Sequence, residues 1–234
     1  MSQFRFKQFT IEQTATPRKV GTDGVLLGAW VDVASMPKRI LDIGTGTGVI
    51  ALMLAQRVAD AQILGVDIES VEEAATNAAC SPWSSRIRFE QTAVQQLDAP
   101  HFDLIVSNPP FFVESLRCPD RGRTMARHAV ALPFDELRDA VVRLLAPDGR
   151  FALVLPTSEA ERFVACCEGK LALRRLTEVR TTPRHAPKRH LMEFVHAACA
   201  PSEVQRDCLT IGTGEHETYT EEYRLLTRDF YLKF

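Results

Sequence analysis

Short apolar runs alternate with longer segments of helical periodicity along most of the chain. Strands are predicted at residues 39–43, 62–66, 87–89, 102–106 and 149–155, followed by a late strand pair at 171–180 and 191–197. Helices are predicted at 23–34, 49–57, 70–79 and 133–146, from residue 158 onward, and within a C-terminal stretch at 216–234. The alternation predicts an α/β fold with a doubly wound, Rossmann-like sheet of seven strands, mostly parallel with an antiparallel late strand.

Polar residues mark where several of these helices begin. Asp23 is placed to cap the first helix, and the patterns Ser70-x-x-Glu73 and Ser158-x-x-Glu161 have the spacing of capping boxes. Residues 1–19 read as an extended lead-in. No linker-like composition divides the chain, so we expect one domain over residues 1–234.

Composition narrows the settings in which the protein works. The chain has 234 residues, of which 45% are hydrophobic, enough for an ordinary core. Its net charge of −2 means that a nucleic-acid partner has to meet a local basic surface. No apolar run approaches the roughly 18–20 residues of a membrane span, and the N-terminus lacks the apolar core of a signal peptide. The six cysteines form no C-x-x-C pair and have no zinc-ligand spacing, so we expect free thiols, no metal site and a cytoplasmic location.

A glycine-rich loop follows the strand predicted at 39–43. Gly44, Gly46 and Gly48 precede a helix, where glycines let the backbone approach a ligand closely. A dinucleotide site would have its third glycine where this chain has Val49. Asp42 stands just before the loop, and a carboxylate there suits an ammonium group better than a pyrophosphate; its alternative role is to cap the following helix.

A second acid, Asp67, ends the next predicted strand. An acid at that place in a doubly wound sheet accepts hydrogen bonds from ribose hydroxyls, although it is also an ordinary turn residue. Together the loop and the two acids indicate a nucleoside that carries an amine and no phosphate. S-adenosylmethionine fits that description.

The segment Asn108-Pro109-Pro110-Phe111 follows the strand predicted at 102–106. Two prolines after an asparagine fix a rigid, extended turn, because each ring restricts its own φ and the residue before it. The turn offers the Asn108 carboxamide and the Pro109 carbonyl as acceptors, and Phe111 as a stacking surface. This combination suits a planar group with an NH2, while the simpler alternative is a proline-rich surface loop.

The glycine loop, the acid after the second strand and the N-P-P-F turn resemble class I S-adenosylmethionine methyltransferases that act on exocyclic amino nitrogens. The closer resemblance is to the bacterial tRNA1(Val) adenine-37 N6-methyltransferase family. It rests on residues 9–13, 19–30, 126–128 and 187–189, which follow the family's order along nearly the whole chain. The 19–30 block is its most family-specific part.

The resemblance implies S-adenosylmethionine as cofactor and methylation of N6 of adenosine 37 in the anticodon loop of tRNA1(Val). The N-terminal extension, residues 1–36, would complete the cofactor pocket. The implied cofactor-binding residues are Lys19, Thr22, Asp23, Asp42, Gly44, Gly46, Gly48, Asp67, Ala93 and Asn108. The implied catalytic residues, which would hold the target base, are Asn108, Pro109, Pro110 and Phe111.

One position departs from the family's pattern. Such enzymes often carry Gly-Asp after the third strand, and the aspartate contacts the cofactor adenine. Here that place reads Thr92-Ala93. We therefore expect adenine recognition through backbone groups and weaker cofactor binding.

Other functions stay open on these motifs. The same turn serves methylation of guanine N2 in ribosomal RNA, of adenine N6 in DNA and of a protein glutamine amide. A protein of another class, an RNA-binding protein with a vestigial cofactor site, would also account for Ala93.

Two basic stretches are candidates for RNA phosphate contacts, although charge runs are usually solvated faces. The first comprises Arg117, Arg121, Arg123, Arg127 and His128; the second comprises Lys170, Arg174, Arg175, Arg180, Arg184, Lys188 and Arg189. The expected partner is therefore tRNA, through its anticodon loop. We expect neither a membrane nor an obligatory protein partner.

Overall fold

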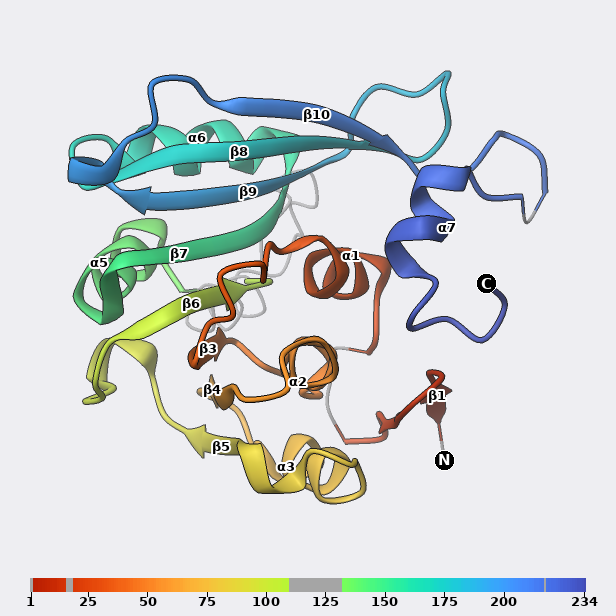
Figure 1. Cartoon of the computed structure of the whole chain (residues 1–234), viewed down its shortest axis with the longest axis horizontal. Helices are drawn as coiled ribbons and strands as arrows, with labels where there is room; N and C mark the ends of the chain where they lie inside the picture. The colour runs from red at the N-terminus through yellow and green to blue at the C-terminus, as the bar shows by residue number, and fades with distance from the viewer. Residues whose placement is uncertain (1, 16–18, 110–131, 217) are drawn as a thin grey trace, which may run out of the picture.

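An eight-stranded sheet forms the centre of the computed structural model, which describes residues 2–15, 19–109, 132–216 and 218–234 (Figure 1). Its strand order is β10-β8-β9-β7-β6-β3-β4-β5. The strands are β3 (Arg39–Ile43), β4 (Gln62–Asp67), β5 (Ile87–Gln91), β6 (Phe102–Ser107), β7 (Leu145–Pro156), β8 (Leu171–Arg180), β9 (Arg189–His196) and β10 (Gln205–Thr210). Only β9 runs antiparallel to its neighbours among these strands.

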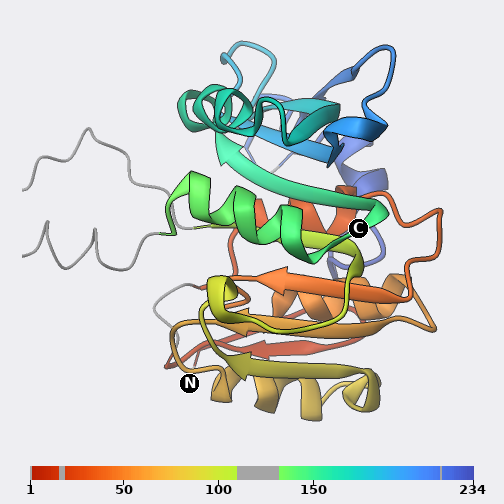
Figure 2. The same ribbon diagram turned by 90° about the vertical axis from the view of Figure 1, so that its left-hand side faces the viewer.

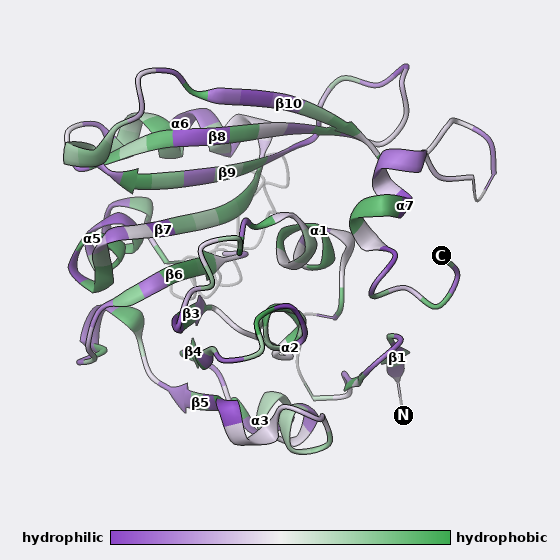
Figure 3. Ribbon diagram, in the orientation of Figure 1, coloured by the Kyte–Doolittle hydropathy of each residue, from purple (hydrophilic) through white to green (hydrophobic). Residues whose placement is uncertain are grey.

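The prediction of a mostly parallel sheet with an antiparallel late strand is confirmed, but the predicted count of seven strands is one too few. The eighth strand, β10, pairs in parallel with β8 at one edge of the sheet. Its first four residues are exposed and only Leu209 is buried, so the strand has almost no hydrophobic pattern to detect. In Figure 3 most of β10 has the hydrophilic colour, whereas β7 is largely hydrophobic.

Helices cover both faces of the sheet. The helices are α1 (Thr22–Trp30), α2 (Val49–Arg57), α3 (Glu72–Ala79), α5 (Phe134–Leu144), α6 (Thr157–Cys167) and α7 (Glu221–Thr227). One core cluster joins α1 and α2 to the sheet, and a second joins α5 and α6 to its other face. The doubly wound prediction is thereby confirmed, and no described helix is long and apolar enough to cross a membrane.

Tight packing explains much of the choice of residues in the 19–30 block. Every residue from Gly24 to Trp30 is buried. A Cβ on Gly28 would stand 2.8 Å from Sδ of Met53 in α2, so glycine permits the two helices to approach closely. Trp30 donates through Nε1 to Thr177 Oγ1 at 2.9 Å, and Arg175 stacks on its ring at 3.7 Å. These contacts fix α1 against α2 and β8.

The helix starts differ from the predictions. Helix α1 begins at Gly21 as N-cap, and Asp23 instead forms an ion pair with Arg189 at 2.8 Å. Helix α3 has Val71 as N-cap with no side-chain cap, so the predicted capping box is wrong, and Glu73 bonds a distant segment. Helix α6 likewise starts after Pro156 without the predicted Ser158 cap. Asp23 of α1 and Glu73 of α3 each bond a residue remote in sequence, and local spacing does not reveal such a partner.

The two ends of the described chain pack together. Strands β1 (Gln3–Arg5) and β2 (Thr10–Glu12) form a small hairpin in the predicted lead-in. Lys7 Nζ donates to the carbonyls of Arg228 and Phe234 at 2.6 Å each. The C-terminal segment is a helix and tail packed on the body, as predicted.

Candidate cofactor and base site

Three of the described residues predicted to form the site lie together at one edge of the sheet. Strands β6, β3 and β4 are parallel neighbours, and Asp42, Asp67 and Asn108 stand at or just after their carboxyl ends. The arrowheads of β5 (olive) and β7 (blue-green) point to this same edge in Figure 2. In open α/β sheets ligands bind outside the carboxyl ends of the strands.

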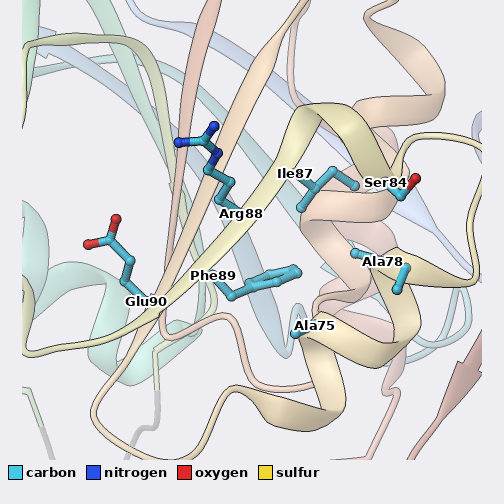
Figure 4. A pocket seen from close by; sticks show the side chains of 8 residues that line it. Ala75, Ala78, Ser84, Ile87, Arg88, Phe89 and Glu90 are labelled. Atoms are coloured by element: carbon cyan, nitrogen blue, oxygen red, sulfur yellow. The ribbon is translucent and has the colours of Figure 1, made fainter.

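The glycine loop has a backbone that only glycine adopts readily. Gly44, Gly46 and Gly48 have φ values of 71°, 54° and 79°, in the left-handed region. A Cβ on Gly48 would also meet the Phe89 ring at 2.9 Å. Figure 4 shows Phe89 extending from β5 toward Ala75 of α3, so this ring lies directly beneath the loop.

Gly65 of β4 is a further constraint that the sequence motifs did not identify. A Cβ there would stand 2.5 Å from the Phe89 ring and 2.8 Å from Thr45 Oγ1. Glycine weakens a strand interior, so an isolated glycine in a strand is a signal of close approach. Gly65 lets the loop and Phe89 pack onto β4.

Asp67 organises the glycine loop. It is 8% exposed, and its Oδ2 accepts from the Gly46 N–H at 3.0 Å while Oδ1 accepts from the Glu69 N–H at 3.1 Å. A carboxylate oxygen has a second lone pair, so both oxygens keep capacity for ligand hydroxyls. Its contact with a ribose stays a prediction.

Asp42 is completely buried at the end of β3. Its Oδ2 accepts from Thr45 Oγ1 at 2.8 Å, and Oδ1 has no hydrogen-bond partner among the described residues. Burial is the main cause that raises the pKa of this carboxyl to about 7, and the nearby charge of Asp67 adds to it. A buried, partly unsatisfied acid gains from a nearby cation. The ammonium-binding role of Asp42 stays a prediction.

Asn108 lies beside the start of helix α1. A Cβ on Gly24 would stand 3.8 Å from its Nδ2, so α1 and the turn after β6 lie close together. The preceding Ser107 donates through Oγ to the Ile43 carbonyl at 2.9 Å and ties β6 to β3 at this edge. Pro109 is buried, and the predicted residues Pro110 and Phe111 lie outside the described residues.

The three candidates at the end of the N-terminal extension differ in their surroundings. Lys19 and Thr22 are exposed. Asp23 is partly buried, and its Oδ2 accepts from Arg189 Nε at 2.8 Å. Arg189 therefore links the start of β9 to the helix that lies beside Asn108.

The side of the site expected to hold an adenine has an apolar residue that the motifs did not identify. Ile68 follows Asp67 directly and is 49% exposed, unusual for a large aliphatic side chain at a strand end. Ala93 is half-buried and precedes the short 3-10 helix at Val94–Gln96. Ile68 thus exposes an apolar surface beside Asp67 that could contact a base. The available signal in the sequence was an apolar residue directly after the strand-ending acid.

The second basic stretch is largely neutralised by acids. Lys170 pairs with Asp139, Arg174 and Arg175 with Glu193, Arg180 with Glu178, and Arg189 with Asp23. Within the described chain Arg184 and Lys188 form no ion pair, and both are exposed on the β8–β9 loop at the carboxyl edge. The first basic stretch, residues 117–128, lies outside the described residues.

The described residues at this edge do not form a metal centre. In the described ranges no group of three or more His, Cys, Asp or Glu side chains could hold a metal ion. The usable features are a glycine cradle, two buried acids, an exposed aliphatic surface and an asparagine on a proline turn. These features suit an uncharged base, a ribose and a cation.

Comparisons with known proteins agree with this description. Residues 35–221 match a family model described as a methyltransferase domain. The chain is 46% identical, over 98% of its length and 97% of the relative, to a tRNA1(Val) (adenine(37)-N6)-methyltransferase from Phocaeicola vulgatus. Further relatives at 42–45% identity carry the same name.

Solved structures share the fold. A protein from Agrobacterium tumefaciens described as a predicted O-methyltransferase superposes with a TM-score of 0.66 at 19% identity, covering 89% of this chain and 96% of the other. A protein from Listeria monocytogenes described as a putative class I S-adenosylmethionine-dependent methyltransferase superposes with a TM-score of 0.56 at 15% identity, covering 80% of this chain and 62% of the other.

Proposed function

Since the chain belongs to the tRNA1(Val) (adenine(37)-N6)-methyltransferase family, we infer that it is an S-adenosylmethionine-dependent enzyme that methylates N6 of adenosine 37 in tRNA1(Val). The observation that carries this conclusion is the 46% identity over nearly the whole of both chains. The site supports it, because Asn108-Pro109 stands beside a cradle suited to a nucleoside with a positive charge.

The described residues fit S-adenosylmethionine. The glycine loop gives the backbone approach, Asp67 would hold the ribose, and Ile68 would contact the adenine face. The buried Oδ1 of Asp42, which lacks a hydrogen-bond partner, matches a cationic ligand. The side chains of Lys19 and Thr22 would border the methionine end, while Asp23 would act there together with Arg189.

In the proposed mechanism the protein makes a poor nucleophile reactive by positioning it. S-adenosylmethionine, when bound, supplies an electrophilic methyl group. The Asn108 carboxamide oxygen and the Pro109 carbonyl accept the two hydrogens of the adenine amine and favour a pyramidal nitrogen. These bonds strengthen as positive charge develops on that nitrogen, so they stabilise the transition state more than the ground state. The proton leaves after transfer from an acidic nitrogen, and no strong base is needed beforehand.

Nucleoside analysis of a methylated product tests the function directly. The protein would be incubated with labelled S-adenosylmethionine and, separately, tRNA1(Val) transcript, the same transcript with guanosine at position 37, ribosomal RNA and DNA. We expect N6-methyladenosine only in the first tRNA. Label recovered as N2-methylguanosine, or in DNA, would overturn the assignment.

Cofactor affinity should depend on pH through Asp42. Its pKa of about 7 means that the carboxyl is protonated in the free protein at lower pH, and a bound cation favours the carboxylate. Binding therefore releases a proton below pH 7. The affinity should rise with pH up to about 7, by at most about tenfold per pH unit for one proton, and then level off.

Calorimetric titration between pH 5.5 and 7.5, in buffers of different ionisation enthalpy, measures both the affinity and the proton released. Asp42→Asn is the matched control, because it keeps the shape and the Thr45 contact without a titrating group. An equal pH slope in the variant would show that another group is responsible.

We propose that Arg184 and Lys188 contact tRNA phosphates. They are the exposed cations of the second stretch that no described acid neutralises. Replacing either by alanine should weaken tRNA binding and reduce the slope of log affinity against log salt by about 0.7–0.9. Binding measured from low to moderate salt gives this slope.

The control for net charge is Lys38→Ala, since Lys38 is equally exposed but precedes β3 at the opposite edge of the sheet. Arg189→Ala should behave differently from both loop variants, because it removes the partner of Asp23 and should impair cofactor binding. An unchanged salt slope in the double variant of Arg184 and Lys188 would exclude this surface.

A further inference from the structure

The N-terminal extension is fastened to helix α3 by two side chains one helical turn apart. Asn77 is 2% exposed; its Oδ1 accepts from the Glu12 N–H at 2.8 Å, and its Nδ2 donates to the Glu12 carbonyl at 3.0 Å. Glu73 Oε1 accepts from the N–H groups of Thr14 and Ala15 at 2.6 and 2.9 Å. Residues four apart share one face of a helix, so α3 presents both groups to the extension.

Asn77 also bonds the glycine loop. Its Nδ2 donates to the Thr47 carbonyl at 3.0 Å, in addition to the Glu12 carbonyl. One buried carboxamide therefore joins three parts of the cofactor site: the extension, the glycine loop and α3. Only an amide offers two donors and an acceptor in this shape, because a carboxylate lacks the donors and an aliphatic chain lacks both.

The rest of the extension is held in the same way. Gln13 is buried, and its Oε1 accepts from the Val20 N–H at 2.7 Å, which draws the end of the extension back toward β2. On the other side of the hairpin, Phe6 stacks on Phe9 with ring centroids 4.5 Å apart and on Tyr231 at 6.1 Å. The extension is thus packed between α3 and the C-terminal tail, so the tail helps to hold the extension in place.

We propose that Asn77 is a positioning residue for the cofactor pocket, which sets the spacing between the glycine loop and the N-terminal extension. The inference rests on the proposed function, since it assumes that the glycine loop holds S-adenosylmethionine. The extension also contains Lys19 and Thr22, and the loop leads to helix α2. A change in their spacing alters how the two walls close on the ligand.

Three substitutions on α3 test this role. Asn77→Ala leaves the backbone groups of Glu12 and Thr47 without a partner, and we expect the Kd for S-adenosylmethionine to rise at least about tenfold. Asn77→Asp keeps the shape and the acceptor but places an oxygen against two carbonyls, so a similar rise is expected. Thr76→Ala is the matched control, since Thr76 is exposed and its hydroxyl bonds only Glu72 of its own helix.

The readouts are the Kd by calorimetry, the rate of tryptic cleavage after Lys19 with and without cofactor, and the melting temperature. Measurements well below melting separate a positioning role from lost stability, because a purely structural residue would change only the last value. If Asn77→Ala fails to fold, Asn77→Asp and Glu73→Gln carry the test, and the latter should show a smaller rise in Kd.

The outcomes separate the two proposals. Wild-type protein that binds S-adenosylmethionine, beside folded Asn77 variants with unchanged Kd and cleavage rate, overturns the positioning role alone. Wild-type protein that binds the cofactor but methylates another nucleotide overturns the proposed substrate and leaves the positioning role standing. Wild-type protein that binds no cofactor overturns both.

Discussion

Asn108→Ala should reduce methyl transfer to tRNA at saturating substrates by about 100–1,000-fold, the usual cost of losing one group that stabilises developing charge. The substitution removes the carboxamide oxygen that would accept from the adenine amine and leaves the two prolines in place. Asn108 lies after the end of β6 and beside α1, outside the sheet, so the fold should survive. Single-turnover rates with preformed enzyme–tRNA complex measure the chemical step.

Asn108→Asp is the informative companion to this variant. A carboxylate still accepts hydrogen bonds from the amine but cannot donate. If accepting these hydrogen bonds is the essential property of residue 108, the aspartate variant should be much more active than the alanine variant. The Kd for S-adenosylmethionine should change little in either. Full turnover by Asn108→Ala would refute the mechanism proposed above.

Asp67→Ala should weaken S-adenosylmethionine binding by about 100-fold or more. Hydrogen bonds to a charged group contribute about 1.5–3 kcal/mol each, and two ribose hydroxyls would lose theirs. The substitution also leaves the Gly46 and Glu69 N–H groups without the acceptor that now holds them. The expected rise in Kd should appear in KM for the cofactor more than in kcat.

A cofactor analogue without ribose hydroxyls separates the two causes. If Asp67 contacts the ribose, the analogue binds the wild-type protein and Asp67→Ala with more similar affinities than S-adenosylmethionine does. If Asp67 only orders the loop, the variant weakens both ligands equally. Asp60→Ala serves as the charge control, because Asp60 is exposed and pairs with Lys38 away from the site.

Local pattern was enough to predict most of the alternating fold. The ranges 39–43, 49–57 and 171–180 match β3, α2 and β8 residue for residue. Each of these elements buries most of one face or its whole length, and burial imposes a period that is visible in the sequence. The polar strand β10 was not predicted for the opposite reason. It is held by hydrogen bonds to β8 and hardly by burial, so its sequence shows no hydrophobic period.

The candidate site was likewise predictable from the sequence only in part. The glycine loop, Asp42, Asp67 and Asn108 were identifiable because each follows a recognisable strand, and parallel strands bring their carboxyl ends to one edge. The seven cations that the sequence offered as RNA contacts differ in their surroundings, because acids on other strands and helices pair with five of them. Arg184 and Lys188, already among the candidates from the sequence, form no ion pair within the described chain, and only the structure separates them from the other five.

The sequence by itself determined the order of most strands and helices, the edge where a ligand is expected and the family, since these depend on residues close together in the chain or on a motif as a whole. Tertiary structure alone decided the partners of Asp23, Glu73 and Asn77, which bond residues 30 or more positions away. The physical reason is that a polar side chain buried on folding requires a partner, while its own sequence neighbours do not specify which distant backbone or charge will meet it.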